Sequence, residues 1–214
     1  MPYRENSEYK HERLILCEGV TDVAFIRKLV QSNGLRHCHI RTTAERKAER
    51  GGSSKFGDAL KGARLSISFR KNVKEIIIVA DSDDDHQRAF QSISDQIRNA
   101  GFASPTQPRQ WAGGTPNIAV FLLPPNEAGV IENYFRDAAA ATEAQVAAFT
   151  DKFVNDCRNQ WPGTKKAKLW YRVFVSANNL KDPNASAATI TLKANPEVIN
   201  FRHPSLNGLI SFLR

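Results

Sequence analysis

Short apolar runs alternate with helix-spaced apolar residues along the first part of the chain. Residues 13–18 (RLILCE), 76–80 (IIIVA) and 118–123 (IAVFLL) are almost wholly apolar, which is typical of strands buried on both faces of a parallel sheet. Residues 21–32 and 90–100 instead carry apolar side chains every three or four positions, which predicts helices. This alternation predicts an α/β fold with a central, mostly parallel sheet flanked by helices.

The remaining segments are predicted to be helical or irregular. The spacing of Leu60, Ala63 and Ile67 predicts one helix, and that of Val146, Phe149, Phe153 and Cys157, after an alanine-rich run from Ala138, predicts a long amphipathic helix. Residues 178–204 are polar and irregular, and residues 206–213 predict a short apolar helix. We therefore expect a first domain at residues 1–140 and a small, mainly helical extension at residues 141–214 that packs on it.

Four carboxylates follow the strand at residues 76–80: Asp81, Asp83, Asp84 and Asp85. They would repel one another unless solvent separates them or a cation holds them together. In an open α/β sheet, ligands bind at the carboxyl ends of the strands. We therefore expect this edge to bind Mg²⁺ or Mn²⁺ through carboxylate oxygens. A solvated acidic turn that begins a helix at His86 is the plainer alternative.

Other carboxylates follow other predicted strands. Glu18 ends the first strand, and Asp22 lies in the first turn of the next helix. If the first strand is the neighbour of the strand before Asp81, both side chains converge with Asp81 and Asp83, and this convergence is the central hypothesis. Glu132 lies in the first turn of a later predicted helix and would reach the same edge, although an interaction with the helix dipole is the simpler interpretation.

Positive charge is concentrated ahead of the acidic cluster. The net charge is +8, and residues 41–74 contain ten basic and three acidic residues, so seven of the eight net charges lie there. Such a segment binds polyanions because Lys and Arg displace counterions from phosphates, whereas the alternative is a merely soluble basic face. The predicted nucleic-acid-binding residues are Arg41, Arg46, Lys47, Arg50, Lys55, Lys61 and Arg64.

The composition is that of an ordinary soluble protein and does not favour a membrane-spanning or disulfide-rich class. The chain has 214 residues, of which 41% are apolar and 24% charged, as in ordinary soluble proteins. Because no apolar run is long enough to span a bilayer and the first residues lack the apolar core of a signal peptide, we expect a cytoplasmic protein without a membrane partner. Cys17, Cys38 and Cys157 are far apart, which favours neither a disulfide framework nor a zinc knuckle.

Two motifs together resemble the toprim domain, the Rossmann-like, metal-binding fold of topoisomerases, primases, recombination proteins and OLD-family nucleases. They are L-I-L-C-E-G-V-T-D and, about sixty residues later, I-I-I-V-A-D-S-D. With the later I-E-N-Y-F, the resemblance is greatest to OLD-family nucleases and small stand-alone toprim proteins, and it covers roughly residues 12–136.

The resemblance implies roles for particular residues. Glu18, Asp81 and Asp83 are the implied primary magnesium ligands, and Asp22 and Glu132 the implied second-site ligands. A catalytic lysine is implied among Lys165, Lys166 and Lys168, and we assign Lys168. A phosphate-binding loop of the form G-x-x-x-x-G-K-[ST] is missing, so the ATPase of many OLD-family proteins would act in trans. A role in phage defence is implied by the resemblance alone, and homodimer formation stays open.

The sequence thus predicts a metal-dependent nuclease that hydrolyses DNA or RNA, with one or two ions and with Glu18 either as a ligand or as the general base. Three alternatives stay open. One is a haloacid-dehalogenase-type phosphatase with Asp81 as nucleophile, although the second acidic pair expected late in such a chain is not evident. The others are a non-catalytic module that binds nucleic acid or a protein, and a nucleotide-binding Rossmann relative, which the lack of G-x-G-x-x-G weakens.

Overall fold

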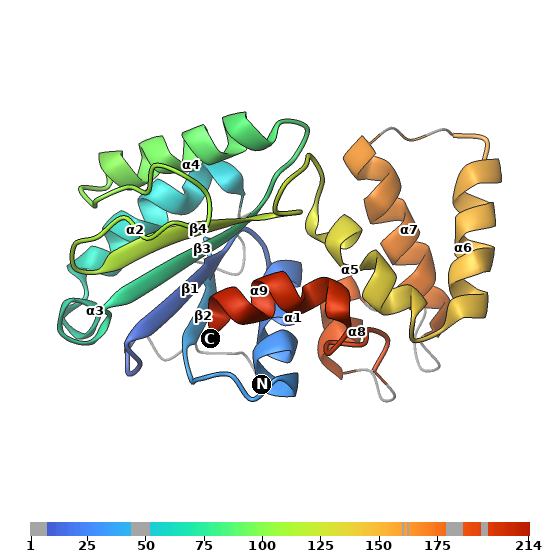
Figure 1. Ribbon diagram of the computed structural model, residues 1–214, viewed down its shortest axis with the longest axis horizontal. Coiled ribbons are helices and arrows are strands. Elements are labelled where there is room, and N and C mark those ends of the chain that lie inside the picture. Colours follow the sequence, from blue (N-terminus) through green and yellow to red (C-terminus); the bar gives the residue numbers. More distant parts are fainter. Residues whose placement is uncertain (1–7, 44–51, 160, 162, 179–185, 194–196) are drawn as a thin grey trace. The chain divides into compact units, whose positions relative to one another are not determined.

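The computed structural model describes residues 8–43, 52–159, 161, 163–178, 186–193 and 197–214. Over these residues the chain forms a sheet of four parallel strands, in the order β2-β1-β3-β4, flanked by helices (Figure 1). The strands are β1 (Arg13–Cys17), β2 (His39–Thr42), β3 (Glu75–Asp81) and β4 (Asn117–Leu123). The predicted α/β fold with a mostly parallel central sheet and a mainly helical C-terminal part is therefore confirmed.

Contacts group the chain into two units. The first, which we call the sheet unit, comprises the described residues of Met1–Gly19, His37–Ala80 and Gln87–Leu122. The second, the helical unit, comprises those of Val20–Arg36, Asp81–His86 and Leu123–Arg214. This grouping does not follow the division that we predicted at residue 140, because the helix after β1 and the turn after β3 belong with the C-terminal helices.

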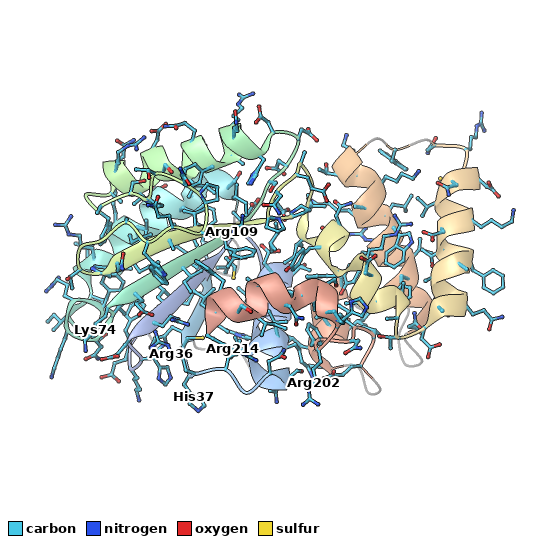
Figure 2. The ribbon with its side chains drawn as sticks, in the orientation of Figure 1. Arg36, His37, Lys74, Arg109, Arg202 and Arg214 are labelled. Atoms are coloured by element: carbon cyan, nitrogen blue, oxygen red, sulfur yellow. The ribbon has the colours of Figure 1, made fainter. Side chains whose placement is uncertain are left out.

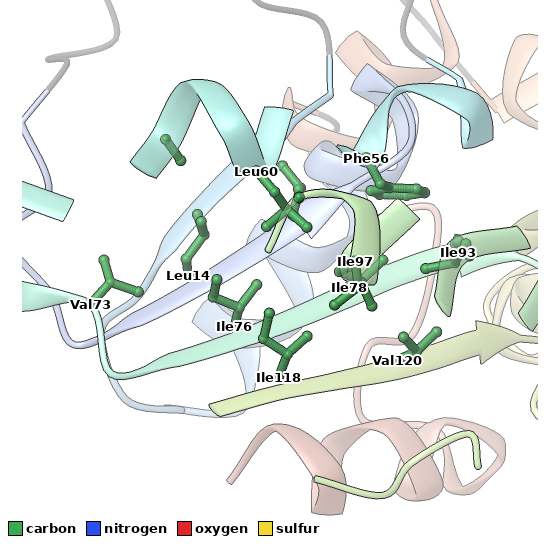
Figure 3. Close-up of a cluster of buried hydrophobic side chains, with 14 of the residues drawn as sticks. Leu14, Phe56, Leu60, Val73, Ile76, Ile78, Ile93, Ile97, Ile118 and Val120 are labelled. Carbon is green, nitrogen blue, oxygen red and sulfur yellow. The ribbon is translucent and has the colours of Figure 1, made fainter. Parts of the chain in front are cut away.

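One apolar core fills a face of the sheet unit. Alternate side chains of β1, β3 and β4 point to this face because side chains along a strand alternate with a period of two. They pack against α2 (Phe56–Leu65), α3 (Ile67–Asn72) and α4 (His86–Asn99), as Figure 3 shows. The labelled members of this core are Leu14, Phe56, Leu60, Val73, Ile76, Ile78, Ile93, Ile97, Ile118 and Val120.

The helical unit has an aromatic core of its own. Its helices are α1 (Val20–Ser32), α5 (Ile131–Ala140), α6 (Ala144–Asp156), α7 (Gly163–Asn178), α8 (Ala187–Lys193) and α9 (Asn207–Leu213). Phe25 of α1 stacks on Phe135 of α5, with ring centroids 3.4 Å apart, and Phe135 meets Tyr171 of α7 edge to face. Short 3₁₀ turns, η1 (Ser53–Lys55) and η2 (Pro204–Leu206), precede α2 and α9. None of the described helices combines the length and apolarity that crossing a bilayer requires.

Two helix predictions were wrong. The helix expected at Leu60, Ala63 and Ile67 is divided, because Ser66 takes an extended conformation that ends α2 and caps α3. The segment from Ala138 likewise forms two helices, since α5 ends at Ala140, where the Thr142 hydroxyl bonds the Ala138 carbonyl.

The face predicted to be buried on the later helix was also wrong. Phe149 and Phe153 are 65% and 53% exposed, whereas Ala147, Thr150 and Val154 of α6 are buried. Smaller side chains allow neighbouring helices to approach one another closely, and α6 packs against α5 and α7 (Figure 1). The two phenylalanines therefore lie on the outer face of α6.

Candidate active site

The acidic turn after β3 separates one buried carboxylate from three exposed ones. Asp81 is the last residue of β3 and is only 9% exposed. Asp83, Asp84 and Asp85 are all exposed to solvent, where their mutual repulsion is screened. The predicted position at the end of a buried strand is confirmed, and it makes Asp81 electrostatically different from its neighbours.

Backbone contacts hold this turn against the segment that follows β4. The buried Ser82 donates its N–H to the Leu123 carbonyl at 2.8 Å and its hydroxyl to the Pro124 carbonyl at 2.8 Å. Asp83 has φ = 50°, a left-handed conformation that Asp tolerates, and its carbonyl accepts the Gly129 N–H at 2.7 Å. The turn is therefore anchored at the two residues that follow Asp81, which fixes the place of Asp83.

Asp81 contacts two helices of the helical unit. Its Oδ1 accepts the N–H of Ile131, the first residue of α5, at 2.7 Å. This N–H lies at the start of the helix, where backbone donors have no partner within the helix and a carboxylate is electrostatically favoured. Its Oδ2 lies 4.0 Å from Nζ of Lys168 on α7. Asp81 thus joins the end of β3 to a helix N-terminus and to a lysine.

Glu132 is a partly buried acid of this region, and its Oε2 atom is buried. It lies in the first turn of α5, as predicted, and burial raises the pKa of its carboxyl, against the opposing effects of its own backbone hydrogen bond and the Lys168 charge. Among the described residues, no group donates a hydrogen bond to its buried Oε2. A buried carboxylate oxygen without a donor is costly, so a proton or cation beside Glu132 would stabilise this arrangement.

The structure distinguishes the three lysines that the sequence left equivalent. Lys168 lies beside Asp81, acts electrostatically on Glu132 and keeps 54% of its side chain exposed. Lys165 lies over the Trp161 ring, at 5.9 Å from its centroid, and Lys166 lines a cavity between α5, α6 and α7. Of the three, Lys168 is therefore the one that the structure brings to the predicted acidic residues.

The predicted convergence of all the carboxylates stays a prediction. Asp22 is buried in the first turn of α1. Like Asp81, Asp83 and Glu132, it belongs to the helical unit. Glu18 belongs to the sheet unit, where its carbonyl accepts the Thr42 and Thr43 hydroxyls at 3.2 and 3.0 Å. Within the part of the chain that the structure describes, no three His, Cys, Asp or Glu side chains form a ready-made metal-binding group.

The predicted nucleic-acid-binding residues have mixed surroundings. Arg46, Lys47 and Arg50 lie outside the described residues. Arg41 packs on the Tyr9 ring at 4.1 Å and Arg64 over the Phe102 ring at 5.6 Å. Lys55 pairs with Asp58 at 3.7 Å, and Lys61 is exposed. The two lysines therefore present charge to solvent, whereas the two arginines also serve the packing of the sheet unit.

The basic segment ends away from the acidic turn. Lys74, labelled in Figure 2, directly precedes β3 and forms an ion pair with Glu12. Asp81 lies at the other end of the same strand. Lys74, the last basic residue of this segment, therefore lies at the amino end of β3, and Asp81 lies at its carboxyl end.

A polar cavity beside Glu132 was not foreseen from the sequence. It has a volume of about 140 Å³ and lies between α5, α6 and α7. On its wall, Arg136 forms an ion pair with Asp151 and lies over the Trp170 ring at 5.4 Å, while the Trp170 indole N–H donates to Asp151 at 2.7 Å. No pattern in the sequence joins these residues, because they come from three different helices.

The fold and the site define an α/β protein in which a buried aspartate, a partly buried glutamate and a lysine lie at the N-terminus of a helix. The chain belongs to the family described as "Protein of unknown function (DUF3226)", whose model matches residues 12–214. Because this match includes the strands and the C-terminal helices alike, both units belong to the family's common sequence. No curated protein and no solved structure matches the chain.

Proposed function

We propose that this protein is a metal-dependent nuclease that hydrolyses phosphodiester bonds of DNA or RNA with Mg²⁺ or Mn²⁺. The observation that carries the proposal is Lys168, which lies beside Asp81 and acts electrostatically on Glu132. Carboxylates with an exposed cation are the groups that phosphoryl chemistry requires. The two toprim-like motifs, which include Asp81 and Asp83, support the same proposal.

The residues fit a hard divalent cation. Glu132 has a buried oxygen that lacks a donor among the described residues, and burial disfavours its charged form, so a cation would remove both costs. Asp81 and Glu132 would hold the ion with Asp83, Asp22 and Glu18. When bound, it would supply Lewis-acid polarisation of the phosphate.

Lys168 has two roles in this proposal. Its ammonium offsets the charge of Asp81 at 4.0 Å. When a phosphodiester binds, the half-exposed side chain can reach the phosphate and stabilise the negative charge that develops on its oxygens. Glu18 would take the proton of the attacking water if it acts as general base, as the sequence suggested.

A non-catalytic module that binds nucleic acid or protein is the second candidate. The observation that favours it is the same ion pair, since Lys168 can compensate the charge of Asp81 within the fold. In either case an ATPase partner acting in trans stays part of the proposal, because the sequence has no phosphate-binding loop of its own.

Cleavage assays distinguish these candidates. Plasmid DNA, single-stranded DNA and RNA are incubated with the full-length protein in Mg²⁺ or Mn²⁺, and fragments are resolved on gels. We expect cleavage by wild type, none by Asp81→Asn, and a decrease of about 100-fold or more for Lys168→Met, since it removes one stabilising charge. Asp95→Asn, on the exposed surface of α4 where Asp95 pairs with Arg98, is the matched control and should cleave normally.

Each contrary result has its own meaning. Binding of nucleic acid without cleavage by wild type in either metal would support the non-catalytic module. Cleavage that survives Asp81→Asn would place the chemistry at another site. Phosphate release from small phosphomonoesters that is lost in Asp81→Asn would identify a phosphatase instead.

A further inference from the structure

The corner between α2 and α3 exposes two large aliphatic side chains. Leu65, the last residue of α2, is 81% exposed, and Ile67, the first residue of α3, is 75% exposed. These are the highest exposures of any large hydrophobic residue that the structure describes. Large apolar side chains that gather at one exposed place, with polar residues around them, mark interaction sites.

The geometry of the corner fixes both side chains outward. The inner faces of the two helices are filled by other residues, among them Leu60 of α2 and Phe69 of α3, which are buried. Between Leu65 and Ile67, the Ser66 N–H donates to the Ala63 carbonyl at 3.0 Å, and the Ser66 hydroxyl accepts the Phe69 N–H at 3.4 Å. The corner is thus capped on both sides, and Leu65 and Ile67 are not displaced members of the core.

Positive charge surrounds this apolar pair. Lys61 precedes Leu65 by four residues on α2, and Lys71 follows Ile67 by four on α3, so each lysine shares an exposed helix face with one aliphatic residue. Arg70 donates from Nη1 to the carbonyls of Arg64 and Leu65 at 2.9 and 3.1 Å, which holds its guanidinium against the corner. Residues 59–74 contain five basic residues and no acidic one.

A second exposed apolar pair provides the comparison. Phe149 and Phe153 on α6 are also exposed, but Lys152 between them pairs with Asp156 at 2.8 Å. At this second pair, the exposed apolar side chains lie beside a lysine whose charge is balanced by an aspartate. Only the α2–α3 corner, of these two surfaces, combines apolar side chains with an excess of one charge.

We propose that the α2–α3 corner is a docking site for an acidic segment of a partner protein that carries neighbouring apolar side chains. Protein interfaces have an apolar centre with a polar rim in which arginine is enriched, and complementary charge steers their encounter. A nucleic acid would satisfy the cations with phosphates but would offer Leu65 and Ile67 no apolar counterpart on its charged exterior. The inference goes beyond the proposed nuclease and does not depend on it.

A designed peptide tests the proposal. A fluorescein-labelled peptide of alternating Leu and Glu is titrated with the full-length protein by fluorescence anisotropy, together with a Leu-to-Ser peptide and a Glu-to-Lys peptide. Saturable binding of the Leu/Glu peptide alone is expected, weakened by about 10-fold or more in Leu65→Ser/Ile67→Ser, as for central interface residues. The matched control, Phe149→Ser/Phe153→Ser, should bind like wild type.

A charge exchange sharpens the test. Lys61→Glu/Lys71→Glu should lose the Leu/Glu peptide and gain the Glu-to-Lys peptide, a result that misfolding cannot produce. Because all four substituted side chains at the corner are exposed, melting followed by circular dichroism should be unchanged in both corner variants.

Several results would overturn the proposal. The first is the absence of saturable binding of the Leu/Glu peptide to wild type. The second is binding of this peptide to the Leu65→Ser/Ile67→Ser variant with the same affinity as to wild type. The variant could instead lose its binding to single-stranded DNA or to phosphatidylglycerol vesicles and keep its binding to the peptide. That result would identify a nucleic acid or a membrane as the occupant of the corner. A dimer that forms with increasing concentration in wild type but not in the variant, measured by light scattering, would identify a second copy of the chain as the occupant.

The docking proposal and the nuclease proposal can fail separately. Nucleic-acid cleavage should persist in Leu65→Ser/Ile67→Ser, and peptide binding should persist in Asp81→Asn.

Discussion

Two buried charges, one in each unit, are treated differently by the fold. In the sheet unit, Arg13 is only 6% exposed, and its guanidinium donates to Glu75 at 2.8 Å across the neighbouring strands β1 and β3. In the helical unit, Glu132 has a buried oxygen without a donor among the described residues, and its pKa is raised by burial. The first charge is compensated within the fold, and the second is compensated only in part, by Lys168.

The difference separates a structural role from a functional one. A paired buried charge contributes to the fold when both partners are present, and removing either partner is costly. A buried acid whose negative charge is only partly compensated lowers the stability of the folded protein. Such groups are common at sites that bind ligands or catalyse reactions. Asp81, Glu132 and Lys168 therefore form the region where we expect ligand binding, whereas Arg13 and Glu75 hold two strands in register.

The largest expected effect comes from breaking the compensated pair. Arg13→Ala should lower the free energy of unfolding by about 3 kcal/mol, because it removes a buried guanidinium and its hydrogen bond to the partly buried Glu75. Urea denaturation followed by circular dichroism measures the change. Arg98→Ala is the control, since its pair with Asp95 is half exposed and should contribute less than about 1 kcal/mol. Equal losses in the two variants would contradict the comparison.

A smaller effect of opposite sign is expected at Glu132. Its folded-state pKa lies above the unfolded value of 4.5, so the neutral form is favoured in the folded protein. The contribution of Glu132 to the stability of the folded state is therefore fully present below pH 4.5, and it is lost as the pH rises through the folded-state pKa. Glu132→Gln should therefore melt higher than wild type at neutral pH, with a gap that closes towards pH 4.

Magnesium extends the Glu132 experiment. If Glu132 binds the ion, Mg²⁺ should raise the melting temperature of wild type more than that of Glu132→Gln, because a ligand that binds only the folded state stabilises it. Equal shifts in both proteins would remove Glu132 from the proposed ligands.

An effect confined to acidic pH is expected at His39, in the sheet unit. Burial, with the charges of His11 and Arg41, lowers its pKa to about 4, and its Nε2 accepts the backbone N–H groups of Lys10 and His11 at 2.6 and 2.9 Å. The unfolded state binds this proton more readily, so stability should fall as the pH decreases from 6.5 to about 4. His39→Gln, which keeps an acceptor, should flatten this dependence in denaturation curves recorded at several pH values.

The sequence by itself determined the strands β1, β3 and β4, the helix–strand alternation and the acidic residues at the ends of β1 and β3. These follow from local patterns, since a short apolar run rich in β-branched residues and bounded by polar residues favours a strand buried on both faces. Asp81 and Glu132 were identified from such patterns, and the structure confirms their places at the end of β3 and in the first turn of α5.

Only the tertiary structure decided which side chains meet. Periodicity assigned Phe149 and Phe153 to a buried face, but close packing selected Ala147 and Val154 instead. Lys168 was one of three equivalent lysines until the fold of the helical unit placed it beside Asp81, and the exposure of Leu65 and Ile67 depends on the break at Ser66. Spacing fixes the direction of a side chain on its own element, whereas its partner comes from another element whose position depends on packing throughout the unit.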